Sequence, residues 1–336
     1  MAEIAVLLPN YNNAPYLKEA VDSILNQSFQ DFIIYFIDDA STDDSIEIIN
    51  GYNDDRIKVF QKETNSGIVD TMNVGLNEIT EKYLIRMDGD DISAPNRFQI
   101  LYDFMETNLD IDVCSSAIKM FGNIEETIRY EKDIDLNKAS LIFSHKIGHA
   151  ASIVRVSILR ELKVKYRNDF QKMEDYDLFY QLRKKARMTA IDDELYFYRK
   201  LDYNHKRDLY WEKLKVFQEF YKMILADLEI EPSDKNSEIH LHFSQRIPPK
   251  YQFKDYLNHK NLILTKNKKL KEFPEIGLSK VIEEKFSALI FRLIDAKKIS
   301  IGQLLKISIS KPKFFYYYLR RLGKKSNPNE VNNNVS

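Results

Sequence analysis

The sequence has very little cysteine and no long apolar segment. Cys114 is the single cysteine of 336 residues, which excludes an internal disulfide framework and a cysteine-rich zinc site and is typical of a reducing compartment. The longest apolar runs, such as residues 32–37, have the length of a strand and fall far short of the ~20 residues that cross a bilayer. The first residues also lack the basic stretch and cleavage site of a signal peptide. We therefore expect a cytoplasmic protein whose contacts with a membrane are peripheral.

The chain also lacks an excess of charge of either sign. Its 50 Lys and Arg residues nearly balance its 51 Asp and Glu residues, which gives a formal net charge of -1. Such a chain has no global attraction to the phosphates of nucleic acid, and we expect no nucleic-acid partner. The 44% of hydrophobic residues is typical of a globular protein, and the length suits one large domain with an appendage or two domains.

Apolar runs alternate with amphipathic helical patterns along the first half of the chain. This alternation predicts βαβ units and an α/β fold with a mostly parallel central sheet. The expected strands are residues 4–8, 32–37, 57–60, 83–87 and 113–117, and the expected helices are residues 16–25, 45–51, 69–80 and 95–108.

Three polar clusters, residues 9–12, 38–43 and 88–91, directly follow expected strands. In open α/β sheets, ligands bind in the crevice outside the carboxyl ends of the strands. A flat aromatic residue, a hydrogen-bonding carboxylate and a pair of metal-binding carboxylates at one edge suit a nucleotide diphosphate. Tyr11 can stack on a base and Asp39 can accept the N3–H of uracil, although capping of the next helix would also explain an aspartate there.

The third cluster is the most informative feature of the chain. Asp88 and Asp90 lie two residues apart, on the same side of an extended segment, and Gly89 between them lets a ligand approach the backbone closely. Mg²⁺ and Mn²⁺ prefer oxygen ligands and often bind one or two carboxylates together with substrate phosphates. The alternative is a solvated acidic turn, because turns favour Asp and Gly.

These motifs, taken in order, resemble the family 2 glycosyltransferases with the GT-A fold, of the type that makes bacterial surface polysaccharides. The resemblance covers about residues 3–200 and is carried by residues 5–12, 23–28, 37–43, 65–67, 73–76, 87–91, 95–98 and 149–155. It implies that Asp39 binds the base, that Asp88 binds in the ribose or metal region, and that Asp90 binds a divalent metal, Mn²⁺ or Mg²⁺, at the two phosphates. The nucleotide-sugar-binding residues that it implies are Pro9, Tyr11, Asp39, Asn65, Gly67, Asp88 and Gly89.

A second acidic cluster, residues 173–179, opens an expected helix. Acidic residues favour the first turn of a helix through the helix dipole, so a structural role would explain them. The resemblance implies instead that Asp175 is the catalytic base, and that Glu174 orients the acceptor or the loop. An inverting transfer needs such a base to take the proton of the attacking hydroxyl.

Two departures from the family pattern concern the charges around the diphosphate. Residues 198–201 read Tyr-Arg-Lys-Leu, where the family often has a histidine in the fourth position, and Met72 stands where an arginine is frequent. A positive partner for the diphosphate must therefore come from elsewhere, and Lys200 and Lys206 are candidates.

Beyond about residue 205 the composition changes. We expect a catalytic domain at residues 1–204, a helical region at 205–325 with helices at 210–228 and 281–293, and a disordered tail at 326–336; the segment 235–270 shows only local patterning. Basic residues interleave with aromatic residues in 297–325 without any acidic residue. This pattern is typical of a segment that binds anionic lipid, which would place the protein at the inner face of the cell membrane, but a basic helix packed on the protein would also explain it.

The sequence thus predicts an inverting, metal-dependent glycosyltransferase that moves a sugar from a nucleotide diphosphate, expected to be UDP, to a glycan or lipid-linked acceptor in surface-polysaccharide synthesis. Two alternatives stay open. A sugar nucleotidyltransferase should have a glycine-rich, basic loop after the first strand, and residues 9–14 contain neither glycine nor a basic residue. A catalytically silent nucleotide-sugar-binding or scaffold protein would not need both a metal pair and a base.

Overall fold

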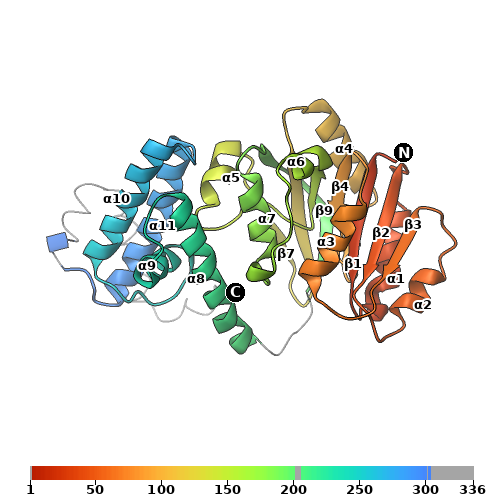
Figure 1. Ribbon diagram of the computed structural model, residues 1–336, viewed down its shortest axis with the longest axis horizontal. Helices are drawn as coiled ribbons and strands as arrows, with labels where there is room; N and C mark the ends of the chain where they lie inside the picture. The colour runs from red at the N-terminus through yellow and green to blue at the C-terminus, as the bar shows by residue number, and fades with distance from the viewer. Residues whose placement is uncertain (1, 201–205, 301, 304–336) are drawn as a thin grey trace. The chain divides into compact units, whose positions relative to one another are not determined.

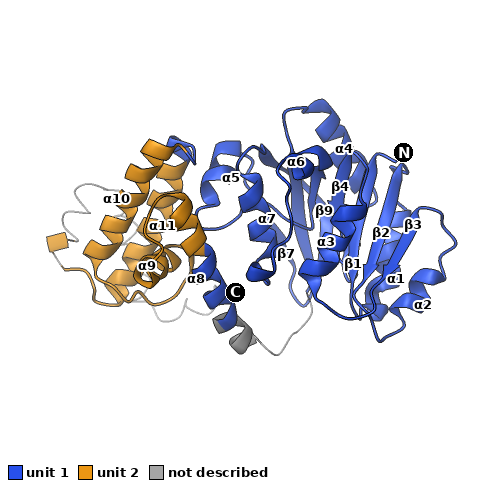
Figure 2. Ribbon diagram, in the orientation of Figure 1, with its two compact units in different colours: residues 1–220, 272–277 blue, residues 221–271, 278–336 orange. Residues whose placement is uncertain are grey.

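The computed structural model describes residues 2–200, 206–300 and 302–303. These residues form two compact units (Figure 2). Unit 1 contains the described residues of 1–220 together with 272–277, and unit 2 contains those of 221–271 and 278–336. The domain bounds expected from the sequence, 1–204 and 205–325, stay a prediction, because compactness in space does not test whether each part folds alone.

The first four strands of unit 1 form a parallel half-sheet in the order β3-β2-β1-β4. They are β1 (Ile4–Asn10), β2 (Phe32–Asp38), β3 (Ile57–Gln61) and β4 (Tyr83–Arg86). All seven residues of β1 are buried, as expected for a central strand that is covered on both faces. The chain adds β2 and β3 on one side of β1 and then places β4 on the other side. This reversal of strand order creates a crevice at the carboxyl ends of β1 and β4.

Three helices connect these strands in the predicted βαβ pattern, and a fourth comes after them in the chain (Figure 1). They are α1 (Ala14–Leu25), α2 (Ser45–Asn50), α3 (Ile68–Glu78) and α4 (Arg97–Thr107). Helix α3 packs on β1 and β2. Gly75 makes this close approach possible, because a Cβ atom there would lie 2.1 Å from a methyl carbon of Leu7.

The other strands of unit 1 make the sheet mixed. They are β5 (Ile92–Ser93), β6 (Val113–Gly122), β7 (Glu126–Ile128), β8 (Ser152–Arg155) and β9 (Met188–Lys200). Strand β8 runs antiparallel to both β4 and β6, whereas β9 runs parallel to β6. The predicted α/β class is confirmed. The antiparallel pairings were not foreseen, because an apolar run does not reveal the direction of its strand.

Short helices and the start of a long one complete unit 1. They are α5 (Ile134–Ser140), α6 (Val156–Glu161), the 3₁₀ turn Asn168–Phe170, α7 (Glu174–Leu182) and the first part of α8 (Lys206–Asp227). Phe220 of α8 is fully buried and contacts the rings of Phe170, Tyr176 and Tyr180. Phe220 therefore belongs to the core of unit 1.

Unit 2 is helical, as expected, but it contains more helix than the sequence predicted. After the end of α8 come α9 (Asp234–Ser244), α10 (Phe253–Leu270) and α11 (Glu275–Asp295). The expectation of only local patterning across 235–270 was wrong. His240, His242 and His259 are buried in the helical core. Because histidine counts as polar in a hydropathy pattern, these buried positions hide the helical spacing of the apolar residues around them.

Among the described residues, no helix is long and apolar enough to cross a membrane. Nearly all of the basic and aromatic segment 297–325, and the whole of the tail 326–336, lie outside the described residues. The predictions made for them are not tested by the structure.

Candidate active site

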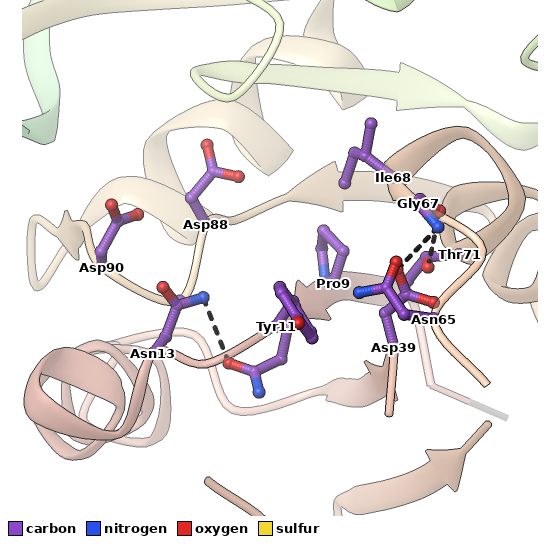
Figure 3. A pocket seen from close by; sticks show the side chains of 12 residues that line it. Pro9, Tyr11, Asn13, Asp39, Asn65, Gly67, Ile68, Thr71, Asp88 and Asp90 are labelled. Atoms are coloured by element: carbon purple, nitrogen blue, oxygen red, sulfur yellow. Dashed lines mark hydrogen bonds between the residues drawn. The ribbon is translucent and has the colours of Figure 1, made fainter. Parts of the chain in front are cut away.

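A cavity of about 360 Å³ opens at the carboxyl ends of β1, β2 and β4, where the strand order reverses. Its size falls within the range of small-molecule sites, ~300–1,000 Å³. Figure 3 shows its lining: Pro9, Asn10, Tyr11, Asn13, Asp39, Asn65, Gly67, Ile68, Thr71, Asp88, Gly89 and Asp90. All the residues that the resemblance assigned to the nucleotide sugar and the metal line this one cavity. Asn10, Asn13, Ile68 and Thr71 were not predicted.

Asp39 lies at one end of the cavity, where a strand, a loop and a helix start converge. Its Oδ1 accepts hydrogen bonds from the Ser66 backbone N–H at 2.9 Å and from Lys62 Nζ at 2.6 Å, and its Oδ2 accepts one from the Gly67 N–H at 2.8 Å. Burial alone would raise the pKa of Asp39, but Lys62 and the two backbone N–H groups hold it below its usual value. Asp39 is therefore a fixed, ionised acceptor.

Gly67 owes its place to its backbone conformation. Its φ of 88° lies in a region that L side chains rarely adopt, and it directly precedes α3. This conformation turns the Ser66 and Gly67 N–H groups toward the two oxygens of Asp39. The glycine thus links the end of β2 to the start of α3.

Tyr11 and Pro9 lie between the two ends of the cavity (Figure 3). The Tyr11 side chain is 47% exposed, which leaves aromatic surface available to a planar ligand. Nearby, Asn10 donates to Asp38 Oδ1 at 2.9 Å and accepts from Asn13 Nδ2 at 3.2 Å. These amide bonds join the carboxyl ends of β1 and β2 to the start of α1 and fix the loop that carries Tyr11.

Asp88 and Asp90 lie at the other end of the cavity, on the loop after β4 (Figure 3). Arg86 binds both oxygens of Asp88, at 2.5 and 2.7 Å. Burial and the nearby charge of Asp88 raise the pKa of Asp90. A cation would relieve both effects, so the two carboxylates suit a divalent metal.

No group of three or more His, Cys, Asp or Glu side chains in the described ranges is arranged to hold a metal ion. A cation here would have to complete its coordination with water or with ligand oxygens. Mg²⁺ and Mn²⁺ commonly bind in this way, through one or two carboxylates and substrate phosphates. The donor set at Asp88 and Asp90 therefore fits a metal that binds together with its substrate.

A buried network that the sequence reasoning missed supports the acidic loop. Asp91 accepts hydrogen bonds from Tyr196 Oη at 2.5 Å and from the Arg199 backbone N–H at 2.7 Å. Burial, aided by the charge of Asp88, raises the pKa of Asp91 to about 7. Arg199 also donates to the Asp90 backbone carbonyl at 2.8 Å, so strand β9 holds the loop in place. In the sequence, the Tyr-Arg pair at residues 198–199 was the feature that could have indicated the contact of Arg199 with the acidic loop.

Arg97, from the motif that follows the acidic loop, is a fully buried arginine. Its Nη2 donates to the backbone carbonyls of Arg86 at 3.1 Å and Ala150 at 2.6 Å, and its guanidinium lies 4.9 Å from the ring centre of Tyr196. Burial lowers its pKa to about 10. Arg97 thereby joins α4 to the end of β4, directly before Asp88.

Glu174 and Asp175 open α7 and do not belong to the cavity lining. Asp175 Oδ2 lies 3.2 Å from His145 Nε2. Burial would raise the pKa of Asp175, but His145 holds it well below its usual value, and the pKa of His145 is raised in return. Glu174 has the opposite environment: burial raises its pKa, and its Oε2 is buried without a hydrogen-bond partner among the described residues.

The two acidic regions are electrostatically connected through Arg86. Burial opposes its charge, but Asp88 and, more weakly, Glu174 hold the pKa of Arg86 above its usual value. Arg86 thus carries positive charge between the cavity and the start of α7. Of the two cations expected from the sequence near the diphosphate, the Lys206 side chain lies outside the described residues, and Lys200 stacks on Tyr198 at 5.9 Å.

Comparison with known proteins identifies the family. The family model described as glycosyl transferase family 2 matches residues 5–162. An uncharacterized glycosyltransferase of Methanocaldococcus jannaschii is 30% identical over 221 residues, which cover 63% of this chain and 74% of that protein. The chain belongs to glycosyltransferase family 2. An uncharacterized glycosyltransferase of Haemophilus influenzae is 26% identical over 234 residues, covering 63% and 72% of the two chains.

The fold of this family 2 glycosyltransferase also resembles a solved structure. The crystal structure of Staphylococcus aureus TarS 1-349 in complex with UDP-GlcNAc matches with a TM-score of 0.59 and 20% identity, covering 92% of each chain. The predicted GT-A fold is confirmed. Membership of this family makes the protein a glycosyltransferase.

Proposed function

We propose that this family 2 glycosyltransferase is an inverting, metal-dependent enzyme that uses a UDP-sugar and transfers the sugar to a glycan or lipid-linked acceptor in cell-surface polysaccharide synthesis. The observation that carries the proposal is the cavity itself. An ionised acceptor, Asp39, lies at one end, an exposed aromatic side chain, Tyr11, lies in the middle, and two carboxylates lie at the other end. This order matches a base held at Asp39 and Tyr11 and a diphosphate held at the two carboxylates.

Asp88 and Asp90 would hold the divalent metal, Mn²⁺ or Mg²⁺, with Asp90 as the main ligand because Arg86 already binds Asp88. When bound, such a cation neutralises charge on the departing diphosphate. The cavity shape orients the donor for attack, and Asp39 fixes the base. TarS, whose structure contains UDP-GlcNAc, supports a uridine donor for this fold.

Asp175 is the proposed base. The acceptor hydroxyl oxygen attacks the anomeric carbon, the bond from that carbon to the diphosphate oxygen breaks, and Asp175 takes the hydroxyl proton. Attack from the opposite face converts an α-linked donor to a β-linked product. His145 keeps Asp175 ionised, and Glu174, beside it at the start of α7, would orient the acceptor or the loop.

The test is a panel of nucleotide sugars with and without Mn²⁺, measured by calorimetry and by slow donor hydrolysis. We expect one UDP-sugar to bind only with metal, and Asp90→Ala to abolish this binding. Asp175→Asn should keep the binding and lose ~10²–10⁴-fold in turnover. Full turnover by Asp175→Asn would refute the proposed base, and metal-independent binding would refute the proposed metal site.

The same comparison decides between the two carboxylates at the start of α7. If Glu174→Gln loses turnover to the extent proposed for Asp175→Asn, while Asp175→Asn stays active, the base is Glu174. Its raised pKa and partnerless oxygen make it the control that this experiment needs.

The basic and aromatic segment 297–325 would bring the enzyme to lipid-linked acceptors at the inner face of the membrane. Its nine Lys and Arg residues without an acidic residue support this role, since each cation near an anionic surface contributes about 1 kcal/mol. Co-sedimentation with vesicles tests it. Binding to phosphatidylserine vesicles but not to phosphatidylcholine vesicles is expected, and equal or absent binding would contradict it.

A further inference from the structure

Lys62 contacts the proposed base-binding carboxylate directly. Its Nζ lies 2.6 Å from Asp39 Oδ1 and 2.8 Å from Asp70 Oδ2, and it also donates to Thr71 Oγ1 at 3.2 Å. Its side chain is only 14% exposed. Burial would lower the pKa of Lys62, but the two carboxylates hold it above its usual value. Lys62 is therefore a fixed cation between β3 and α3.

The hydrogen bonds of Asp39 leave it few free acceptor positions. A carboxylate has about four acceptor positions, two on each oxygen. Lys62 and the Ser66 N–H fill both positions of Oδ1, and the Gly67 N–H fills one of Oδ2. Among the residues that the structure describes, no other group donates to Asp39. One acceptor position, on Oδ2, stays free for a ligand.

The common bases differ in what they present to a single charged acceptor. Uracil offers one ring N–H between two carbonyl groups. Guanine offers two adjacent donors, the N1–H and the N2 amino group, and pairs well only with two acceptors side by side. Cytosine and adenine place an acceptor nitrogen beside their amino group, which an ionised carboxylate repels. A buried donor left without a partner costs binding energy.

We propose that Lys62 determines the base specificity of the donor site, because by occupying Asp39 Oδ1 it limits Asp39 to one acceptor and so selects uracil over guanine. This inference rests on the proposed function, in which Asp39 binds the base. It adds a residue outside the cavity lining, which acts through Asp39 as a positioning residue rather than by touching the ligand.

The first experiment uses the unchanged enzyme with Mn²⁺ and compares UDP, GDP and inosine diphosphate by calorimetry. Inosine diphosphate has the size of GDP but lacks the second donor. With one acceptor available, UDP should bind most tightly, and GDP should bind no more tightly than inosine diphosphate. Tighter binding of GDP than of inosine diphosphate would show two open acceptors and overturn the inference.

The second experiment compares Lys62→Met with Lys62→Arg and a control, Lys58→Met. Lys62→Met opens a second acceptor on Oδ1, so GDP should gain about tenfold relative to inosine diphosphate, the effect of one hydrogen bond to a charged group. Lys62→Arg keeps a charged donor and should retain the original ratio. Lys58, on β3 and exposed, should leave the ratio unchanged when replaced.

The possible results separate the inference from the proposed function. If UDP binds but Lys62→Met leaves the ratio of GDP to inosine diphosphate unchanged, or weakens all three nucleotides equally, Lys62 does not set specificity and the donor proposal survives. If the unchanged enzyme binds no uridine nucleotide, the donor proposal fails and the inference fails with it. Because the first experiment needs no variant, an unstable Lys62→Met protein does not prevent a decision.

Discussion

At the scale of single residues, the site depends on backbone groups as much as on side chains. The sequence indicated Asp39 and Gly67 as binding residues, but it could not show that the loop before α3 donates its N–H groups to Asp39. That contact depends on one conformation, the φ of 88° at Gly67, and on Lys62, which the sequence presented as an ordinary charged residue after a strand.

Gly67→Ala should therefore weaken UDP binding. A side chain in this glycine-favouring conformation, φ 88° and ψ 170°, costs about 1–3 kcal/mol, and relaxation of the strain would turn the N–H groups away from Asp39. We expect at least a fivefold loss of UDP affinity by calorimetry. Gly51→Ala, where φ is -70° at the end of α2, is the matched control and should bind normally. Unchanged affinity in Gly67→Ala would contradict the role of the loop.

His145 should set the acid limit of activity if Asp175 is the base. The ion pair with His145 lowers the pKa of Asp175, so the base stays ionised at low pH. In His145→Asn the burial of Asp175 persists without the cation, and its pKa rises. The acid limb of the kcat profile should then move to higher pH, with UDP affinity unchanged. A profile that keeps its acid limb would exclude His145 from this role.

At the scale of elements, the loop after β4 is held from both sides. Strand β9 binds it through Tyr196 and Arg199. Helix α4 contacts its first residue, Met87, through Arg97 and binds the end of β4 through the same side chain. The sequence placed the strand and the acidic loop correctly. Tyr196 and Arg199 lie 105 and 108 residues from Asp91 along the chain, and no local pattern connects them, so only the folded sheet brings Tyr196 to Asp91.

Arg97→Leu should destabilise unit 1. It removes the donor to two backbone carbonyls in a fully buried setting, and an acceptor left without a partner costs about 1–3 kcal/mol. We expect a loss of about 3 kcal/mol in the free energy of unfolding, measured by urea denaturation. Arg56→Leu is the control, because Arg56 forms a partly exposed pair with Asp54 that should contribute less than about 1 kcal/mol. Equal losses in both variants would contradict the proposal that the buried hydrogen bonds of Arg97 stabilise unit 1.

At the scale of the whole molecule, the two units differ in the chemistry of their cores. Unit 1 packs a hydrophobic sheet core, whereas unit 2 buries His240, His242 and His259 among aromatic rings. His240 Nδ1 lies 3.1 Å from His259 Nε2. Burial lowers the pKa of His259 and of His242 below the usual value, so folding favours the neutral form of both.

The stability of unit 2 should fall in mild acid. The unfolded chain binds protons at these histidines below about pH 6.5, whereas the folded chain binds them only at lower pH, so stability decreases as the pH falls. Between pH 6.5 and 5.5 the loss at His259 should reach about 1 kcal/mol, and the loss at His242, whose pKa is lowered less, should be smaller. Urea titrations at both pH values measure the loss, and His259→Leu should show a shallower pH dependence. The same slope in this variant would mean that other groups cause it.

The sequence by itself determined the α/β class, the family and most of the cavity lining. The residues that line the cavity follow the strands in short local motifs, and such motifs can be recognised without knowledge of the folded structure. Asp39, Asp88 and Asp90 could be found in this way, since each follows an apolar run at the same edge of a parallel sheet. Tertiary structure alone decided what each carboxylate contacts. Lys62 and His145, for example, contact Asp39 and Asp175, and such pairings depend on distances between segments that no periodicity in the sequence encodes.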